Sequence, residues 1–131
     1  MAKGGELTKS LIRLAKRVAA RIEGKALTID ASLYQARIRC GRKACRCMRS
    51  TYRHSMWCLS RVRDGKSMTR TVPEPSLAEV RKMCQAHCEL RAMRRELQRL
   101  AREAVALLDQ HGQAMAKQGW RRFEQMKEAG Q

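Results

Sequence analysis

Four cysteines and a histidine lie close together in the middle of this chain. Cys40 begins the run Cys-Gly-Arg-Lys-Ala-Cys-Arg-Cys, which also contains Cys45 and Cys47, and His54 and Cys58 follow it. Thiolates and imidazoles are ligands that zinc prefers, and a tetrahedral structural site takes four of them. The glycine directly after Cys40 permits the tight turn that a metal knuckle needs. The spacing therefore predicts a bound zinc ion.

The identity of the fourth ligand is the open point of this site. Cys40, Cys45 and Cys47 supply three ligands, and either His54 or Cys58 supplies the fourth. We favour His54 because it precedes the next predicted strand, where a side chain can swing toward the metal, whereas Cys58 lies within that strand. With four protein ligands the ion has no open position, so the site is predicted to be structural. The alternative is a small core of reduced cysteines without a metal.

Basic residues surround the predicted knuckle. Some lie on or beside it, and others follow on the next two predicted strands. A loop that a metal fixes, with this many cations, would present a preformed surface to phosphate groups. The predicted nucleic-acid contacts are Arg37, Arg39, Arg42, Lys43, Arg46, Arg49, Arg53, Arg61, Arg63, Lys66 and Arg70. The alternative is a solvated basic loop that serves solubility.

The charge of the whole chain favours the same kind of partner. Its 131 residues include 29 Lys or Arg and 12 Asp or Glu, a net charge of +17, and its pI is near 10.7. Residues 32–75 hold eleven basic and two acidic residues, a net charge of +9, so more than half of the excess lies there. This balance suits a polyanion. Five aromatic residues are few for stacking single-stranded bases.

We predict an α+β fold in which two helices flank a small antiparallel sheet. Residues 1–31 form an N-terminal amphipathic helix, whose apolar stripe contains Leu7, Leu11, Leu14, Val18 and Ile22. Residues 32–75 form a three-stranded zinc-knuckle sheet, in which Asp64-Gly65 is the turn of a hairpin. A sheet this small needs a metal ion or a packed helix for stability.

The longest regular pattern lies in residues 76–111, which are predicted to form a long helix. Apolar residues recur there every seven positions over residues 83–107, as in a coiled coil. The helix is expected to end at about Gln110, which leaves residues 112–131 as a basic C-terminal tail, helical or frayed. Residues 80–108 are the predicted interface for a homodimer or for a larger protein partner.

Two more cysteines lie on this helix. Cys84 and Cys88 are four residues apart and share a helix face, with His87 between them. Two ligands are too few for a closed zinc site. We therefore predict that both are small core residues and keep a second metal site as the alternative.

A series of short motifs across residues 32–108 follows one family pattern. The motifs are Ser32-Leu33-Tyr34, Arg39-Cys40-Gly41, Cys45-Arg46-Cys47, His54, Leu59-Ser60, Gly65-Lys66 and Val72-Pro73, followed by a long charged helix. They resemble a family of small bacterial proteins catalogued as a domain of unknown function. The resemblance implies that His54 completes the ligand set, because Cys58 stands where that family tends to carry an aromatic residue. At Ser55-Met56 the chain departs from the family's Gly-Pro pair.

We expect a nucleic-acid-binding accessory protein that is not an enzyme, with double-stranded DNA as the favoured partner. The chain has no glycine-rich phosphate loop and no nucleophile beside a base. Families like the one it resembles often occur near mobile-element genes, which suits a DNA-linked role. The alternatives are an RNA-binding protein and an adaptor or scaffold subunit of a larger recombination or ribonucleoprotein complex. No apolar run is long enough to cross a membrane, and no secretory signal is apparent, so we expect a cytoplasmic location.

Overall fold

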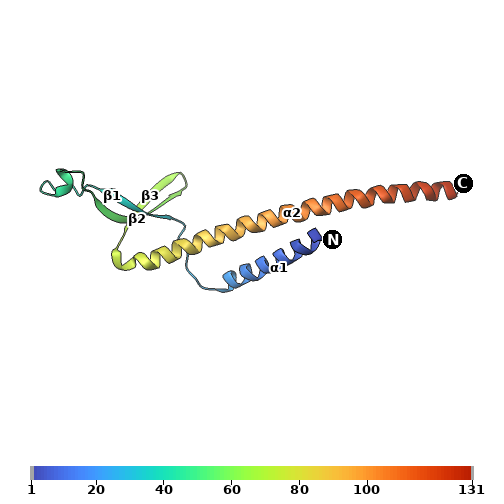
Figure 1. Ribbon diagram of the computed structural model, residues 1–131, viewed down its shortest axis with the longest axis horizontal. Helices are drawn as coiled ribbons and strands as arrows, with labels where there is room; N and C mark the ends of the chain where they lie inside the picture. Colours follow the sequence, from blue (N-terminus) through green and yellow to red (C-terminus); the bar gives the residue numbers. More distant parts are fainter. Residues whose placement is uncertain (1, 131) are drawn as a thin grey trace. The chain divides into compact units, whose positions relative to one another are not determined.

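The computed structural model describes residues 2–130 and has the order of elements that the sequence predicts (Figure 1). Helix α1 (Ala2–Glu23) comes first, and helix α2 (Leu77–Ala129) comes last. Between them lie the strands β1 (Ser32–Ile38), β2 (His54–Arg63) and β3 (Lys66–Val72). Short 3-10 turns at Arg46–Met48 and Glu74–Ser76 complete the connections. The prediction of an α+β fold with a three-stranded antiparallel sheet is confirmed.

Strand β2 is central, and the pairing register separates the two faces of the sheet. Arg37 pairs with Ser55, Arg63 with Lys66, and Leu59 with Arg70. Because successive side chains point to opposite faces, these cations lie on the same face as Trp57. We call Arg37, Arg61, Arg63, Lys66 and Arg70 the basic face. The opposite face, which includes the row Tyr34, Cys58 and Thr71, carries no Lys, Arg, Asp or Glu on these strands.

The hairpin between β2 and β3 turns as predicted. Asp64 has a φ of 53° and Gly65 a φ of 76°. Two consecutive residues with positive φ form the type I′ turn, whose twist matches that of the flanking strands. This turn sets the register that brings Arg63 opposite Lys66.

The sheet and the first turns of α2 form one compact unit, residues 25–91, which we call the sheet unit. The Trp57 ring lies 5.0 Å from the Arg81 guanidinium, so the basic face is the one turned toward α2 at this point. The backbone N–H of Ile29 donates to the Met83 carbonyl at 3.2 Å. Val72 of β3 is buried. The small sheet is therefore packed against a helix, as its size requires.

The two cysteines of α2 have different environments. Cys84 is buried, as predicted for a core residue, and this burial raises the pKa of its thiol. Cys88 is exposed, so its prediction as a core residue is wrong. A spacing of four residues turns the helix by about 40° beyond one full turn. That offset is enough to leave Cys88 outside the small contact area.

Helix α1 and the rest of α2 form a second compact unit, residues 2–24 with 92–130, which we call the helix unit. Leu7 and Leu14 of α1 and Met93 and Leu100 of α2 are buried. The predicted stripe on α1 is confirmed up to Val18, which is half-buried. Ile22 is 77% exposed, so the packed part of the stripe ends one turn earlier than predicted.

Helix α2 is longer than predicted. It continues without a break to Ala129, whereas the sequence predicts an end at about Gln110 and a tail from residue 112. A glycine inside a helix costs only about 1 kcal/mol relative to alanine. The residues around Gly112 and Gly119 include many good helix formers, and no proline follows. Neither helix in the described part of the chain is both long and apolar enough to cross a membrane.

Candidate metal centre

Three cysteines and a histidine converge in the connection between β1 and β2. One ligand atom each from Cys40, Cys45, Cys47 and His54 lies within 4.8 Å of the other three. The Sγ atoms of Cys40 and Cys47 are 3.6 Å apart, and Cys45 Sγ lies 3.1 Å from His54 Nε2. Cys47 is fully buried, whereas Cys40 lies at the surface. Such a group can hold a metal ion.

Cys58, the alternative fourth ligand, is not a member of this group. It lies within the central strand, paired with Tyr34 on one side and Thr71 on the other. Its thiol is buried on the uncharged face of the sheet. His54 is the first residue of β2 and completes the set of four.

The backbone of the loop is shaped around the sulfur atoms. Gly41 has a φ of +81°, which turns the chain sharply after the first cysteine. The Cys40 N–H donates to Cys47 Sγ at 3.4 Å, and the Cys45 N–H donates to the Arg42 carbonyl at 3.0 Å. Hydrogen bonds to ligand atoms orient them and tune their charge. The turn residues thus bring the thiols together on one side of the loop.

The thiols differ in how readily they lose a proton. The Arg42 N–H, followed by the Cys45 thiol, lowers the pKa of Cys40 to about 6. The Cys47 N–H favours the thiolate of Cys45, but the nearby sulfurs of Cys40 and Cys47 outweigh it and raise the pKa of Cys45. Neighbouring thiolates repel one another. A bound cation offsets that repulsion, so this cluster is suited to binding a metal cation.

Arg53 holds the loop from inside. Its Nη1 donates to the carbonyl oxygens of Cys47 at 3.0 Å, Ser50 at 3.0 Å and Tyr52 at 2.7 Å. The side chain is half-buried. The sequence predicts Arg53 as a phosphate contact and does not reveal these hydrogen bonds to the loop. No local pattern distinguishes the one arginine whose side chain turns toward the loop carbonyls from its exposed neighbours.

Tyr52 orients the histidine of the group. Its ring meets the His54 imidazole edge-on, with the ring centroids 5.4 Å apart. The Arg46 guanidinium also lies over the Tyr52 ring, 5.0 Å from its centroid. This packing leaves Nε2 as the ring atom near Cys45. Sequence analysis did not single out Tyr52; its position two residues before a ligand was the available signal.

Comparison with known proteins identifies the family of this chain. A family model described as a domain of unknown function (DUF6788) matches residues 6–82. That segment is more than half of the chain and contains most of α1, the whole sheet and all four members of the metal group. The chain belongs to the DUF6788 family. The DUF6788 match begins and ends earlier than the resemblance over residues 32–108, so most of α2 lies outside it. No curated protein and no solved structure matches the chain.

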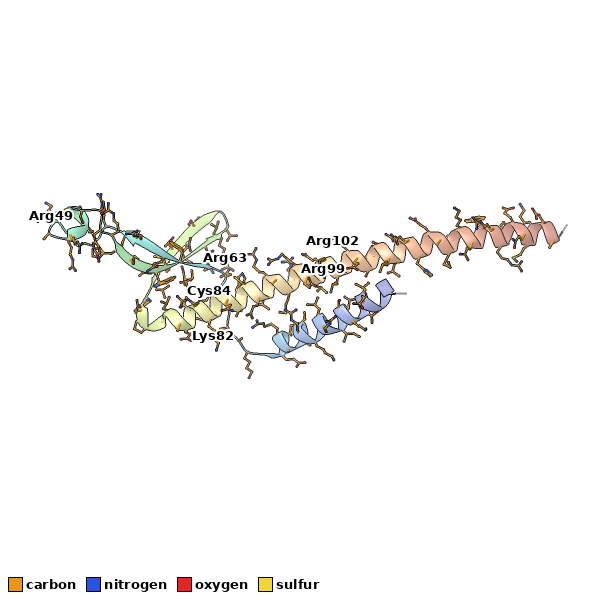
Figure 2. The ribbon with its side chains drawn as sticks, viewed as in Figure 1. Arg49, Arg63, Lys82, Cys84, Arg99 and Arg102 are labelled. Carbon is orange, nitrogen blue, oxygen red and sulfur yellow. The ribbon has the colours of Figure 1, made fainter. Side chains whose placement is uncertain are left out.

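Apart from the half-buried Arg53, the predicted nucleic-acid contacts of the DUF6788 segment fall into two groups. One group is exposed on the connection between β1 and β2, which we call the knuckle loop (residues 39–53): Arg39, Arg42, Lys43, Arg46 and Arg49. Figure 2 labels Arg49 on this loop. The other group is the basic face of the sheet. There, Arg61 donates to Asp30 at 2.9 Å and lowers the pKa of that carboxyl group. Arg37, Arg63, Lys66 and Arg70 are exposed.

Proposed function

We propose that this chain is a nucleic-acid-binding accessory protein whose knuckle loop is held by a structural zinc ion. One observation carries the proposal: three of the four clustered ligand atoms and five exposed cations belong to the knuckle loop, and the fourth ligand, His54, directly follows it. A metal that orders this loop orders the cations with it. Their positions would then be fixed before a partner arrives, which lowers the entropy cost of binding.

Zinc suits the donor set better than other common ions. Three thiolates and one imidazole are a frequent tetrahedral zinc set, with zinc–sulfur bonds of about 2.3 Å. In a regular tetrahedron of that size the sulfurs stand about 3.8 Å apart. The distance of 3.6 Å between the sulfurs of Cys40 and Cys47 is close to this value. Because all four ligands come from the protein, the ion would have a structural role.

Double-stranded DNA is the partner that we favour. The knuckle loop offers arginines for phosphates but, apart from Tyr52, no aromatic ring on which unpaired bases could stack. Arginine reads guanine in the wide major groove of DNA, whereas the major groove of RNA duplexes is too narrow for side chains. A protruding loop with several arginines therefore fits a DNA duplex better.

Salt-dependent binding tests this proposal. With about six phosphates neutralised, the affinity for a DNA duplex should fall roughly a thousandfold between about 50 and 200 mM salt. The triple variant Arg42→Ala, Lys43→Ala, Arg49→Ala should reduce the slope of log affinity against log salt by about three. Fluorescence anisotropy with matched DNA and RNA duplexes measures both quantities.

The matched control removes the same charge from another region. Lys9, Arg13 and Lys16 are exposed on α1, and their triple alanine variant has the same net charge as the knuckle variant. It should keep the slope of the wild type. Equal losses in both variants would mean that binding follows net charge and not the knuckle loop. No binding to any duplex at low salt would refute the proposal.

An adaptor role is the rival candidate, and the exposed apolar side chains of α2 favour it. An adaptor would bind nucleic acid only inside a larger assembly. The isolated protein should then show weak binding without preference for any duplex. Gel-shift titrations of the purified chain separate the two roles.

A further inference from the structure

The C-terminal part of α2 carries an apolar face that the described chain leaves uncovered. Large side chains stand exposed there, among them Leu108 at 69%, Phe123 at 47% and Met126 at 55%. Spacings of three and four residues place them on one side of a helix. We call this side the apolar face; it consists of Val105, Leu108, Gly112, Met115, Ala116, Gly119, Phe123 and Met126.

Helix α1 is too short to cover this face. Its 22 residues measure about 33 Å, whereas residues 92–129 of α2 in the same unit measure about 57 Å. The side chains of α2 that are buried in this unit, Met93 and Leu100, lie near the beginning of that segment. From residue 108 onward every described residue is exposed.

We propose that the apolar face pairs with the same face of a second copy of this chain, in antiparallel orientation. With the two-fold axis between residues 117 and 118, Phe123 of each copy lies opposite Gly112 of the other. Ala116 then lies opposite Gly119 beside the axis, where two small residues let the helices approach closely, and the large Phe123 meets the small Gly112 on either side. A shallow hollow lined by Ala116, Gly119, Trp120 and Phe123 receives Met115 of the second copy.

The charges of this segment favour self-association. Residues 105–129 carry four basic and three acidic side chains, a net charge of +1 in a chain of +17. Two copies therefore repel each other less here than along the rest of the protein. Antiparallel pairing brings Asp109 toward Lys127 of the second copy. Parallel pairing would instead place Lys127 beside Lys127 and Arg122 beside Arg122.

The length of the face sets the expected affinity. Stable interfaces bury about 1,200–2,000 Å² in total. Residues 105–126 measure about 33 Å along the helix. The area that they bury approaches the lower of these values only when the two helices are in contact over this whole length. We therefore expect a dimer that dissociates in the micromolar range. The segment lies outside the DUF6788 match, so this pairing does not depend on the proposed zinc ion or nucleic acid.

Sedimentation equilibrium of the full chain at high salt, where nucleic acid is released, tests the proposal. The wild type should be a dimer at about 100 µM and dissociate on dilution. Phe123→Ala should raise the dissociation constant by about 30-fold or more, because it removes the largest side chain of the apolar face. A wild type that stays monomeric at this concentration would overturn the proposal.

Gly112→Leu distinguishes this geometry from other kinds of apolar association. A Cβ atom at Gly112 meets nothing within 4 Å, and the residue is exposed, so the monomer should tolerate a side chain there. In the antiparallel dimer it collides with Phe123 of the second copy, and the dissociation constant should rise by about tenfold. In a parallel or unspecific pair the added leucine would tighten association, and that result would overturn the geometry.

Two further variants complete the experiment. Gln110→Leu adds the same side chain on the opposite side of α2 and should leave the dissociation constant unchanged. Gly112→Leu combined with Phe123→Ala restores one large and one small group at each contact, so the double variant should dimerise better than either single variant. Additive losses in the double variant would contradict the proposed pairing of positions 112 and 123.

Discussion

The sheet unit and the helix unit hold their side chains in place by different means. In the knuckle loop of the sheet unit only Cys47 is buried, and the loop is shaped by hydrogen bonds to sulfur and by the carbonyl bonds of Arg53. In the helix unit, Leu7, Leu14, Met93 and Leu100 are instead buried between two helices. A loop rich in cations cannot form an apolar core, so it needs polar or metal bonds to stay ordered.

The two units also differ in the partner that they suit. Residues 32–75 carry a net charge of +9, concentrated on a loop with exposed arginines. Residues 105–129 carry +1 and an exposed apolar face. The first surface suits a polyanion, and the second suits another protein surface. The two proposed contacts thus lie in different units of the chain, and perturbing each unit alone tests that separation.

Removing the metal should have the largest effect, confined to the sheet unit. Structural zinc sites contribute on the order of 10 kcal/mol to folding. We expect one zinc ion per chain in the purified protein and none in Cys45→Ser. The variant should also lose the dispersed amide signals of the knuckle loop and of the adjoining ends of β1 and β2, because this loop has no apolar core that could replace the metal. Elemental analysis and two-dimensional NMR measure the two losses.

Cys88→Ser is the matched control for this experiment. Cys88 is an exposed cysteine outside the metal group, so its replacement should keep both zinc and structure. Cys58→Ser should likewise keep the zinc ion. Full metal content and an intact sheet in Cys45→Ser would show that the zinc proposal is wrong.

Leu100→Ala should have the second largest effect, confined to the helix unit. Leu100 is 2% exposed, and replacing a buried leucine by alanine costs about 2–5 kcal/mol. A loss of this size is comparable with the whole stability of many small units, so α1 should detach from α2. Hydrogen exchange should then rise across residues 7–18 while the zinc content stays unchanged. A simultaneous loss of zinc would show that the two units are coupled.

Sequence patterns predicted the features that depend on neighbours in the chain. The turn at Asp64-Gly65 and the spacing of the cysteine run are both local, and each appears in the structure as expected. The choice of His54 over Cys58 also rested on local context, since one precedes a strand and the other lies within it. Short-range geometry decides such features, so spacing alone is informative.

Features that depend on distant parts of the chain were not predictable in this way. Ile22 continues the stripe of α1 but has no surface on which to pack, and Cys88 lies just outside the contact that buries Cys84. Arg53 looks like its basic neighbours in sequence, yet it alone bonds three carbonyl oxygens of the loop. The end of α2 was misplaced because glycine was given more weight than the good helix formers around it.

Arg53→Ala should have a moderate effect on the knuckle loop. It removes three hydrogen bonds from a charged donor, and the net loss should be about 1–3 kcal/mol. The variant should release zinc at a lower chelator concentration than the wild type while retaining it without chelator. Arg53→Lys should rescue little, because an ammonium group cannot reproduce the geometry of the guanidinium. Exposed Arg49 gives the control, since Arg49→Ala should leave zinc retention unchanged.

Ile22→Ala should have the smallest effect, and its contrast with Leu14→Ala isolates burial from sequence pattern. Both residues belong to the predicted apolar stripe of α1, but Leu14 is 3% exposed and Ile22 is 77% exposed. Replacing Leu14 should destabilise the helix unit by about 2–5 kcal/mol. Replacing Ile22 should change its stability by no more than about 0.5 kcal/mol, because the side chain is already in water. Chemical denaturation followed by circular dichroism compares them, and equal losses would mean that Ile22 is buried in solution by a contact beyond the helix unit.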